Sequence, residues 1–299
     1  MKFDIVCFGS AVVDVFVDTD VAEKNNFISY PAGGKILIKE LKFDIGGGGT
    51  NTAAAFSRLG FKTGCICKVG NDGNGEKILE LLKKEKVKFL GNRGKSSKSG
   101  YSIILDSKGG DRTILTYKGA NDEISQKDIK KFKTRWLYFS SLLGESLETQ
   151  KKLANSLKRK GAKVAFNPSS YLIKNENLNS LLRITDILIL NKEEARMLVG
   201  SKERDLLKGL YHLTKGIVVI TDKNRLIECY DGNKKFSLVP HKIKVVERTG
   251  AGDAFASGFV AGRMAGKGIQ ECLKLGLRES ESVIRYFGAK NNLLRFKLK

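Results

Sequence analysis

Short apolar segments alternate with amphipathic segments along almost the whole chain of 299 residues. Apolar runs of about four to eight residues are typical of buried strands, and apolar residues spaced three and four apart are typical of helices. These patterns predict strands at 3–9, 62–68, 87–90, 136–140, 162–166, 186–190, 216–221, 225–230 and 235–239. They predict helices at 50–59, 73–85, 145–160, 192–199, 203–213, 252–265 and 268–287. This order favours an α/β fold with three αβα layers around a mainly parallel central sheet.

Four segments depart from that order because their apolar and polar residues alternate with a period of two. They are 11–18, 35–43, 99–106 and 112–117. The run Ser107-Lys108-Gly109-Gly110-Asp111 between the last two is typical of a hairpin turn. We expect a small β-sheet lid formed by about 11–45 and 96–118, within one domain spanning 1–299. The alternative is that these segments are edge strands of the main sheet.

The composition bounds the class of protein. The chain is 41% hydrophobic, which suffices for a large core, and no apolar run is long enough to cross a bilayer. Residues 1–4 lead straight into a strand without a signal segment, so a cytoplasmic enzyme without a membrane partner is expected. The five cysteines lie mostly in apolar runs and indicate buried thiols.

The net charge of +22 raises the question of nucleic-acid binding. The basic residues are, however, spread among acidic ones, as in Lys83-Lys84-Glu85-Lys86, and no arginine-rich tail or aromatic-and-basic ladder is present. Most of the charge is therefore expected to lie on a solvated, lysine-rich surface, although an anionic substrate such as ATP would also benefit from it. Nucleic-acid binding ranks third among the functional hypotheses.

The run Thr249-Gly250-Ala251-Gly252-Asp253 leads into an apolar helical segment. A small-residue turn at a helix start leaves backbone N–H groups unpaired, and these groups can hold a phosphate or a developing oxyanion. An acid in that position indicates a base that accepts a proton from a hydroxyl group. The alternative is an ordinary N-capped helix, because Asp and Gly are both common at helix starts.

A second glycine cluster, Gly46-Gly47-Gly48-Gly49, precedes Thr50 and Asn51 at another predicted helix start. Glycines allow a ligand to approach the backbone closely, and Asn51 can hydrogen-bond to hydroxyl groups. The cluster is not a dinucleotide fingerprint, because the third glycine of that pattern would fall on Asn51. The run Gly94-Lys95-Ser96 also fails as a P-loop, since Phe89 stands where its first glycine is required.

Two polar groups follow predicted strands. Asp14 lies just past the first strand, at the edge where parallel sheets bind ligands, although solvated turn acids are also common there. Asn191 follows the strand at 186–190, and Glu194 stands three residues later, the spacing of a capping box. The functional alternative places one of these two groups on a magnesium-bound water or on a phosphate.

Taken together, these motifs resemble those of the ribokinase-like (PfkB) carbohydrate kinases. The glycine cluster with Asn51 resembles their N-terminal signature, and Thr249 to Phe255 resembles their C-terminal signature. The resemblance extends to Asp14, to Gly119-Ala120-Asn121 and to Asn191 through Glu194, and it covers the chain in order. It implies a ribokinase-like fold, ATP and Mg²⁺ as cofactors, and phosphorylation of a hydroxymethyl group on a sugar or nucleoside.

The resemblance also implies roles for single residues. Asp253 would be the general base, the backbone of Gly250, Ala251 and Gly252 would be the anion hole, and Asp14, Gly47 and Asn51 would hold acceptor hydroxyls. Asn191 and Glu194 would organise Mg²⁺ through its waters. Thr221, Thr249, Gly250 and Gly252 would contact the nucleotide.

Some residues depart from the family pattern or leave alternatives open. The usual Asp-Thr before Thr249 is Glu247-Arg248 here, which puts the monovalent cation of relatives in question. Arg112 could meet an acceptor phosphate or be a surface residue, and Tyr101 could contact the acceptor or pack inside the lid. The acceptor could therefore be a sugar, a nucleoside or, as in phosphofructokinases, a sugar phosphate. A non-catalytic sugar-binding or nucleotide-binding homologue is the competing class, and a homodimer through the lid edges is expected.

Overall fold

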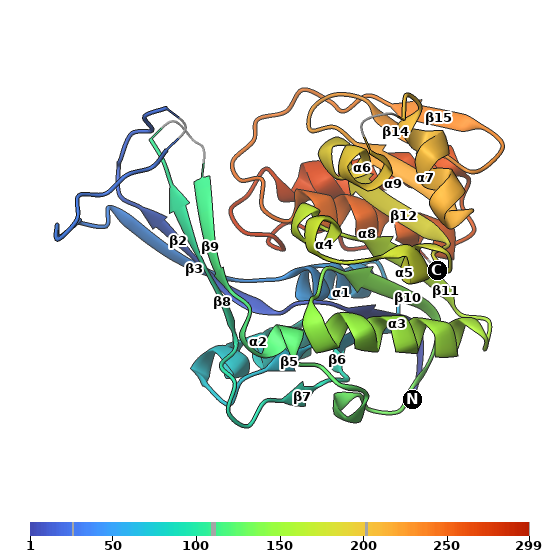
Figure 1. Cartoon of the computed structure of the whole chain (residues 1–299), viewed down its shortest axis with the longest axis horizontal. Coiled ribbons are helices and arrows are strands. Elements are labelled where there is room, and N and C mark those ends of the chain that lie inside the picture. Colours follow the sequence, from blue (N-terminus) through green and yellow to red (C-terminus); the bar gives the residue numbers. More distant parts are fainter. Residues whose placement is uncertain (26, 109–111, 201–202, 299) are drawn as a thin grey trace.

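The computed structural model describes residues 1–25, 27–108, 112–200 and 203–298. A nine-stranded sheet runs through the molecule (Figure 1). In spatial order its strands are β15 (Lys235–Leu238), β14 (Ile227–Tyr230), β13 (Ile217–Thr221), β12 (Ile187–Asn191), β11 (Lys163–Asn167), β10 (Lys133–Ser140), β1 (Lys2–Phe8), β4 (Thr63–Ile66) and β6 (Lys88–Phe89). Neighbours from β6 to β13 pair in parallel, and β14 and β15 pair antiparallel.

The parallel strands are nearly continuous apolar runs because both faces of the sheet are covered. In β1, Ile5 and Cys7 belong to the core on one face, and Val6 and Phe8 belong to the core on the other. The alternation follows from the period of two along a strand. The sequence therefore predicted the three-layer fold correctly.

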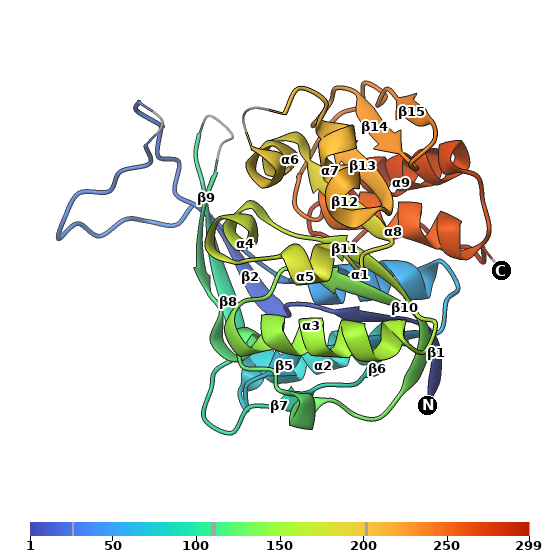
Figure 2. The same ribbon diagram turned by 45° about the vertical axis from the view of Figure 1, so that its right-hand side comes forward.

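Helices form a layer on each face (Figures 1 and 2). Apolar side chains of one layer share a core with Ile5 and Cys7; this layer contains α1 (Gly48–Arg58), α2 (Gly73–Lys84), α8 (Ala251–Met264) and α9 (Ile269–Val283). The opposite layer contains α3 (Gly144–Lys158), α4 (Ser170–Asn175), α5 (Asn179–Leu182), α6 (Lys192–Val199) and α7 (Leu206–Thr214). Every helix in the described part of the chain is too short or too polar to span a bilayer.

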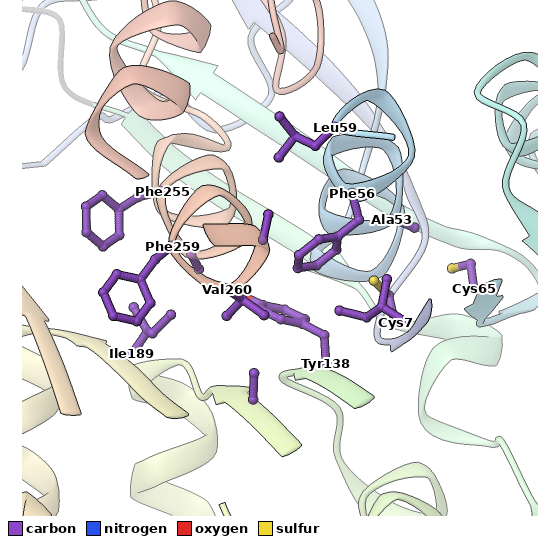
Figure 3. Packing of buried hydrophobic residues seen from close by; sticks show 14 of the residues in the cluster. Cys7, Ala53, Phe56, Leu59, Cys65, Tyr138, Ile189, Phe255, Phe259 and Val260 are labelled. Carbon is purple, nitrogen blue, oxygen red and sulfur yellow. The ribbon is translucent and has the colours of Figure 1, made fainter. Parts of the chain in front are cut away.

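Helices α1 and α8 lie next to each other above the centre of the sheet (Figure 3). Ala54 and Ala55 of α1 and Ala254 of α8 belong to one buried cluster with Val283 and Leu293, and the small alanine side chains allow the two helices to approach closely. Beneath them Phe56 of α1 packs edge-on against Tyr138 of β10, with ring centroids 5.6 Å apart. The amino-terminal ends of the two helices consequently lie beside each other at the carboxyl edge of the parallel strands.

A separate four-stranded sheet stands beside this body (Figure 1). Its order is β3 (Glu40–Gly46), β2 (Val12–Asp18), β8 (Gly100–Asp106) and β9 (Arg112–Tyr117). The central pair is parallel and the outer pairs are antiparallel. The expectation of a small sheet is thus confirmed, and the alternative of edge strands in the main sheet is wrong.

One amide fixes the point where the small sheet leaves the body. Asn121 Oδ1 accepts from the Ala11 N–H at 2.8 Å, and its Nδ2 donates to the Ala11 carbonyl at 3.0 Å. Gly100 begins β8 at the same point, where a Cβ atom would come within 2.2 Å of Asn121 Nδ2. The chain is therefore held by two hydrogen bonds just before β2, and the first residue of β8 packs closely against the same amide.

Several predicted boundaries need correction. The strand predicted at 35–43 begins at Glu40, and the helix predicted at 203–213 begins at Leu206 with Asp205 as its N-cap. The helix predicted at 268–287 ends at Val283, because the Ile284 carbonyl instead accepts backbone N–H groups of the loop before α8. Short elements without a clear period were missed: β5 (Lys68–Val69), β7 (Asn92–Arg93), α4, α5 and 3₁₀ turns at Gly119–Asp122 and Gln126–Asp128. Residues 109–111 of the predicted hairpin turn lie outside the described residues.

Candidate active site

Two glycines set the starts of α1 and α8. Gly47 (φ 94°) precedes α1 and Gly250 (φ 78°) precedes α8, both in a backbone region that disfavours other residues. A Cβ atom would come within 2.5 Å of the Ser10 carbonyl at Gly47, and within 2.6 Å of Ala289 at Gly250. Neither helix start carries a cap from the side chain of its N-cap residue. At the start of α1 the Gly48 and Gly49 N–H groups donate to the Ser10 hydroxyl (3.2 Å) and the Ser10 carbonyl (2.9 Å), so these amides are engaged.

The amides at the start of α8 fit an anion. The Ala251 N–H donates to the Arg248 carbonyl at 3.2 Å, whereas the N–H groups of Gly250, Gly252 and Asp253 have no acceptor within the described residues. A Cβ atom at Gly252 would meet nothing within 4 Å, so the space before it is open. The sequence named Gly250, Ala251 and Gly252 as the anion hole; among these three, the Ala251 amide is engaged by the turn itself.

Asp253 lies in the first turn of α8 and is partly exposed. Its Oδ2 accepts from Asn51 Nδ2 of α1 at 2.8 Å, and it makes no salt bridge with any described residue. Burial raises the pKa of the Asp253 carboxyl, while the Asn51 hydrogen bond and the nearby Lys290 ammonium oppose that rise. The two glycine motifs, 202 residues apart, therefore meet at one carboxylate.

Lys290 is a site residue that the sequence did not indicate. It is 2% exposed, and its ammonium donates to Asn51 Oδ1 at 2.5 Å and to the Ile45 carbonyl. No motif contains it, and it lies beyond the last predicted helix, which covers 268–287. Only the folded chain brings it to the α1 start.

Two carboxylates of the small sheet face the same place. Asp14 of β2 and Asp44 of β3 are cross-strand partners, and both interact electrostatically with Lys290. Burial raises the pKa of Asp14 to about 6, although a hydrogen bond from Ser102 and the charge of Lys290 oppose the rise. Asp44 was not among the predicted residues, because an acid two positions before a glycine cluster belongs to no recognised motif.

Tyr101 lies elsewhere. It is the β8 neighbour of Val13, whereas Ser102 neighbours Asp14, and successive residues of a strand point to opposite faces. With Tyr117 and Lys77 it lines a different cavity of about 540 Å³. The structure therefore does not bring Tyr101 together with Asp14.

Arg112 of β9 reaches across to the loop before α8. Its Nη1 forms a salt bridge with Glu247 and donates to Thr249 Oγ1 at 2.7 Å. Glu247 Oε1 also accepts from the backbone N–H groups of Arg248 (2.7 Å) and Thr249 (2.8 Å). Arg112 and Glu247 thus shape this loop, and Arg112 is not a lone surface residue.

The predicted nucleotide residues lie on adjacent strands. Asn191 and Thr221 are partners in the β12–β13 register, and both line a cavity of about 450 Å³ with Ala251 and Gly252. Glu194 is 9% exposed and forms the expected capping box, in which its Oε2 accepts from the Asn191 N–H at 2.9 Å. Burial raises the pKa of Glu194.

The pKa of Asp14 predicts a pH dependence of stability. Its folded-state pKa of about 6 exceeds an unfolded value of about 4, so the free energy of unfolding should fall as the pH rises through that window. Asp14→Asn resembles the protonated form. We expect this variant to be more stable than the parent at pH 8, by on the order of 2 kcal/mol, and equally stable near pH 4. Thermal unfolding at both pH values measures this, and an equal gain at both would contradict it.

Comparisons with known proteins agree with this geometry. The pfkB family carbohydrate kinase model matches residues 2–295. A sugar kinase of Archaeoglobus fulgidus, itself uncharacterized, is 30% identical over 250 residues, or 80% of this chain and 98% of that protein. A cytidine kinase of Thermococcus kodakarensis is 35% identical over 147 residues, or 47% of this chain and 53% of its own.

The fold also matches a solved structure. Arabidopsis thaliana ribokinase, complexed with ribose and ATP, superimposes with a TM-score of 0.82 at 21% identity, covering 99% of this chain and 96% of that one. The chain therefore belongs to the pfkB family of carbohydrate kinases, phosphotransferases that act on an alcohol group of a sugar or nucleoside.

Proposed function

We propose that this protein transfers the γ-phosphoryl group of ATP to a hydroxymethyl group of an unphosphorylated sugar or a nucleoside, with Asp253 as the general base. One observation supports this most directly. The Asp253 carboxylate stands beside unengaged amides at the start of α8 and is held by Asn51 without a salt bridge to a described residue. A carboxylate held in this way can both orient a hydroxyl group and accept its proton.

The chain's own groups divide the work. Asp253 accepts the hydroxyl proton as the acceptor oxygen attacks the γ-phosphorus, and the bond to the ADP oxygen breaks. The N–H groups of Gly250 and Gly252 bind the phosphoryl oxygens, assisted by the dipole of α8. Positioning and charge stabilisation account for most of the catalysis in phosphoryl transfer.

The nucleotide and its magnesium fit the edge formed by β12 and β13. We place ATP in the cavity lined by Asn191 and Thr221, with Thr249 near the phosphates. Mg²⁺ bound to the phosphates would neutralise their charge. The capping box already uses Asn191 Oδ1 and Glu194 Oε2, and no cluster of three acidic, His or Cys side chains that could hold a metal occurs among the described residues. Contact with Glu194 through water therefore fits better than direct ligation.

The charges around the acceptor favour an unphosphorylated substrate. Asp14 and Asp44 present carboxylates, which accept hydrogen bonds from hydroxyl groups and repel phosphate. Arg112, the residue that could meet an acceptor phosphate, is already bound to Glu247 and Thr249. A sugar-phosphate kinase is the second candidate, because a 6-phosphofructokinase of Thermoanaerobacterium thermosaccharolyticum is among the relatives at 26% identity.

Asp253→Asn tests the base. The amide cannot accept the proton, so turnover should fall by roughly 10²–10⁴-fold while ADP binding stays within a few fold. Turnover is measured with ribose, fructose, fructose 6-phosphate, adenosine, guanosine, cytidine and uridine as acceptors. Near-normal turnover in this variant would remove Asp253 from the mechanism. Nucleotide binding by the parent without turnover on any acceptor would favour the non-catalytic homologue.

Arg112 also bears on the monovalent cation that the sequence resemblance placed near Glu247. Its guanidinium already neutralises the Glu247 carboxylate, so we expect no requirement for potassium. Parent turnover should be equal within about twofold in potassium and in tetramethylammonium chloride at the same ionic strength. Activation by potassium of more than tenfold would contradict this.

We further propose that the small sheet is a lid and that two chains associate through its outer face. Leu41 and Phe43 of β3 and Leu115 and Tyr117 of β9 are all about half exposed there. Apolar surface of this kind is usually covered. Phe43→Lys should convert a dimer into a monomer in sedimentation, whereas Tyr171→Lys, at an equally exposed aromatic on α4, should not. A parent protein that is monomeric at micromolar concentration would exclude the dimer.

A further inference from the structure

Lys290 is a buried ammonium that the proposed chemistry leaves without a role. Burying an ammonium group is costly unless it is paired and hydrogen-bonded. Lys290 is 2% exposed and donates to Asn51 Oδ1 at 2.5 Å and to the Ile45 carbonyl. It makes no salt bridge within 4 Å among the described residues, so its closest side-chain partner is a neutral amide.

The contact with Asn51 has a direct consequence for the base. An asparagine amide presents an acceptor oxygen on one side and a donor nitrogen on the other. An ammonium can only donate, so Lys290 fixes the oxygen toward itself and the nitrogen toward Asp253, where Nδ2 donates at 2.8 Å. Without Lys290 the amide could turn over and set its oxygen against the Asp253 carboxylate.

Charged side chains from β2, β3, α1 and α8 act electrostatically on Lys290. Burial lowers the pKa of Lys290, and the charge of Arg58 on α1 acts in the same direction. The carboxylates of Asp44 on β3, Asp14 on β2 and Asp253 on α8 oppose that fall and favour the charged form. Asp44 Oδ2 is buried without a hydrogen-bond partner among the described residues. Lys290 is therefore the cation that these three carboxylates share.

Beneath the base the neighbouring groups stay neutral. Burial raises the pKa of Cys7 to about 12, and it raises the pKa of Tyr138 well above its usual value. Neither group therefore adds a negative charge beside Asp253.

The backbone of Lys290 is fixed as firmly as its amine. Its carbonyl accepts from Arg58 Nη1 at 2.6 Å. Arg58 in turn forms a bidentate pair with the buried Glu85, at 2.7 and 2.6 Å. An unbroken series of hydrogen bonds thus runs from Glu85 through Arg58, Lys290 and Asn51 to Asp253.

We propose that Lys290 is a positioning residue for phosphoryl transfer, which fixes the orientation of the Asn51 amide and keeps the Asp253 carboxylate ionised. This inference rests on the proposed role of Asp253 as the base. Lys290 acts through Asn51 and through its charge, and it does not touch the reacting atoms.

Lys290→Met removes the charge at nearly constant length. We expect kcat at high pH to fall roughly 10- to 100-fold, with KM for ATP within about twofold of the parent value. The positive charge lowers the pKa of Asp253, so its loss should move the acid limb of the pH–rate profile to higher pH by about one unit. An acid limb that does not move would overturn the electrostatic part of the proposal.

A double-mutant cycle with Asn51→Ala tests the amide. If Lys290 acts through Asn51, Lys290→Met should lower the high-pH kcat by less than about twofold once Asn51 is alanine. Independent, multiplying losses would overturn the positioning role. Lys290→Gln keeps a hydrogen-bond donor without a charge. It should therefore restore much of kcat, while the acid limb of the pH–rate profile stays at the higher pH. It also serves as the second variant if Lys290→Met does not fold.

Leu293→Ala is the matched control, because this buried residue belongs to the same C-terminal segment but carries no charge. It should lower Tm and leave the acid limb in place.

Carboxyl ¹³C NMR of aspartate-labelled protein supplies a readout without turnover, with Asp253→Asn assigning the signal. If the parent transfers phosphate to no acceptor, the proposed function fails, but the NMR titration of Asp253 still tests the role of Lys290. A rise of about one unit in the pKa of Asp253 in Lys290→Met would support the proposal. An unchanged pKa would overturn it.

Discussion

The close contact of α1 with α8 is the constraint on which the site depends. Alanines at this contact let two helices from opposite ends of the chain lie next to each other, so that their first turns open at the same edge of the sheet. Larger side chains would separate Asn51 from Asp253 and break the 2.8 Å hydrogen bond between them. Packing in the core thus sets the geometry of the partly buried polar contact between Asn51 and Asp253.

Charge balance is the second constraint. The carboxylates of Asp14, Asp44 and Asp253 all interact electrostatically with Lys290, and burial raises the pKa of Asp14 and of Asp253. Two cations offset them from different parts of the chain: Lys290 is enclosed in the interior, and Arg112 crosses from the small sheet to Glu247. The overall charge of +22 describes the outer surface and says little about this interior.

The sequence predicted those features that depend on local pattern. The alternation of strand-like and helix-like segments predicted the three layers, and the segments with a period of two predicted the small sheet. The glycine runs predicted where α1 and α8 begin. Lys290 and the Arg112–Glu247 pair could not be predicted, because each contact joins residues more than a hundred positions apart. The side-chain direction of Tyr101 depended on strand register, which apolar spacing alone did not fix.

Asn121 hydrogen-bonds to Ala11 just before β2 and lies against Gly100 at the start of β8, and this limits how the small sheet can move. Strands pinned at one end can pivot there but cannot slide along each other. A given swing displaces Asp14, close to the pivot, far less than Asp18 at the other end of β2. Asp14 can therefore stay close to Lys290 while the far end of the small sheet changes position.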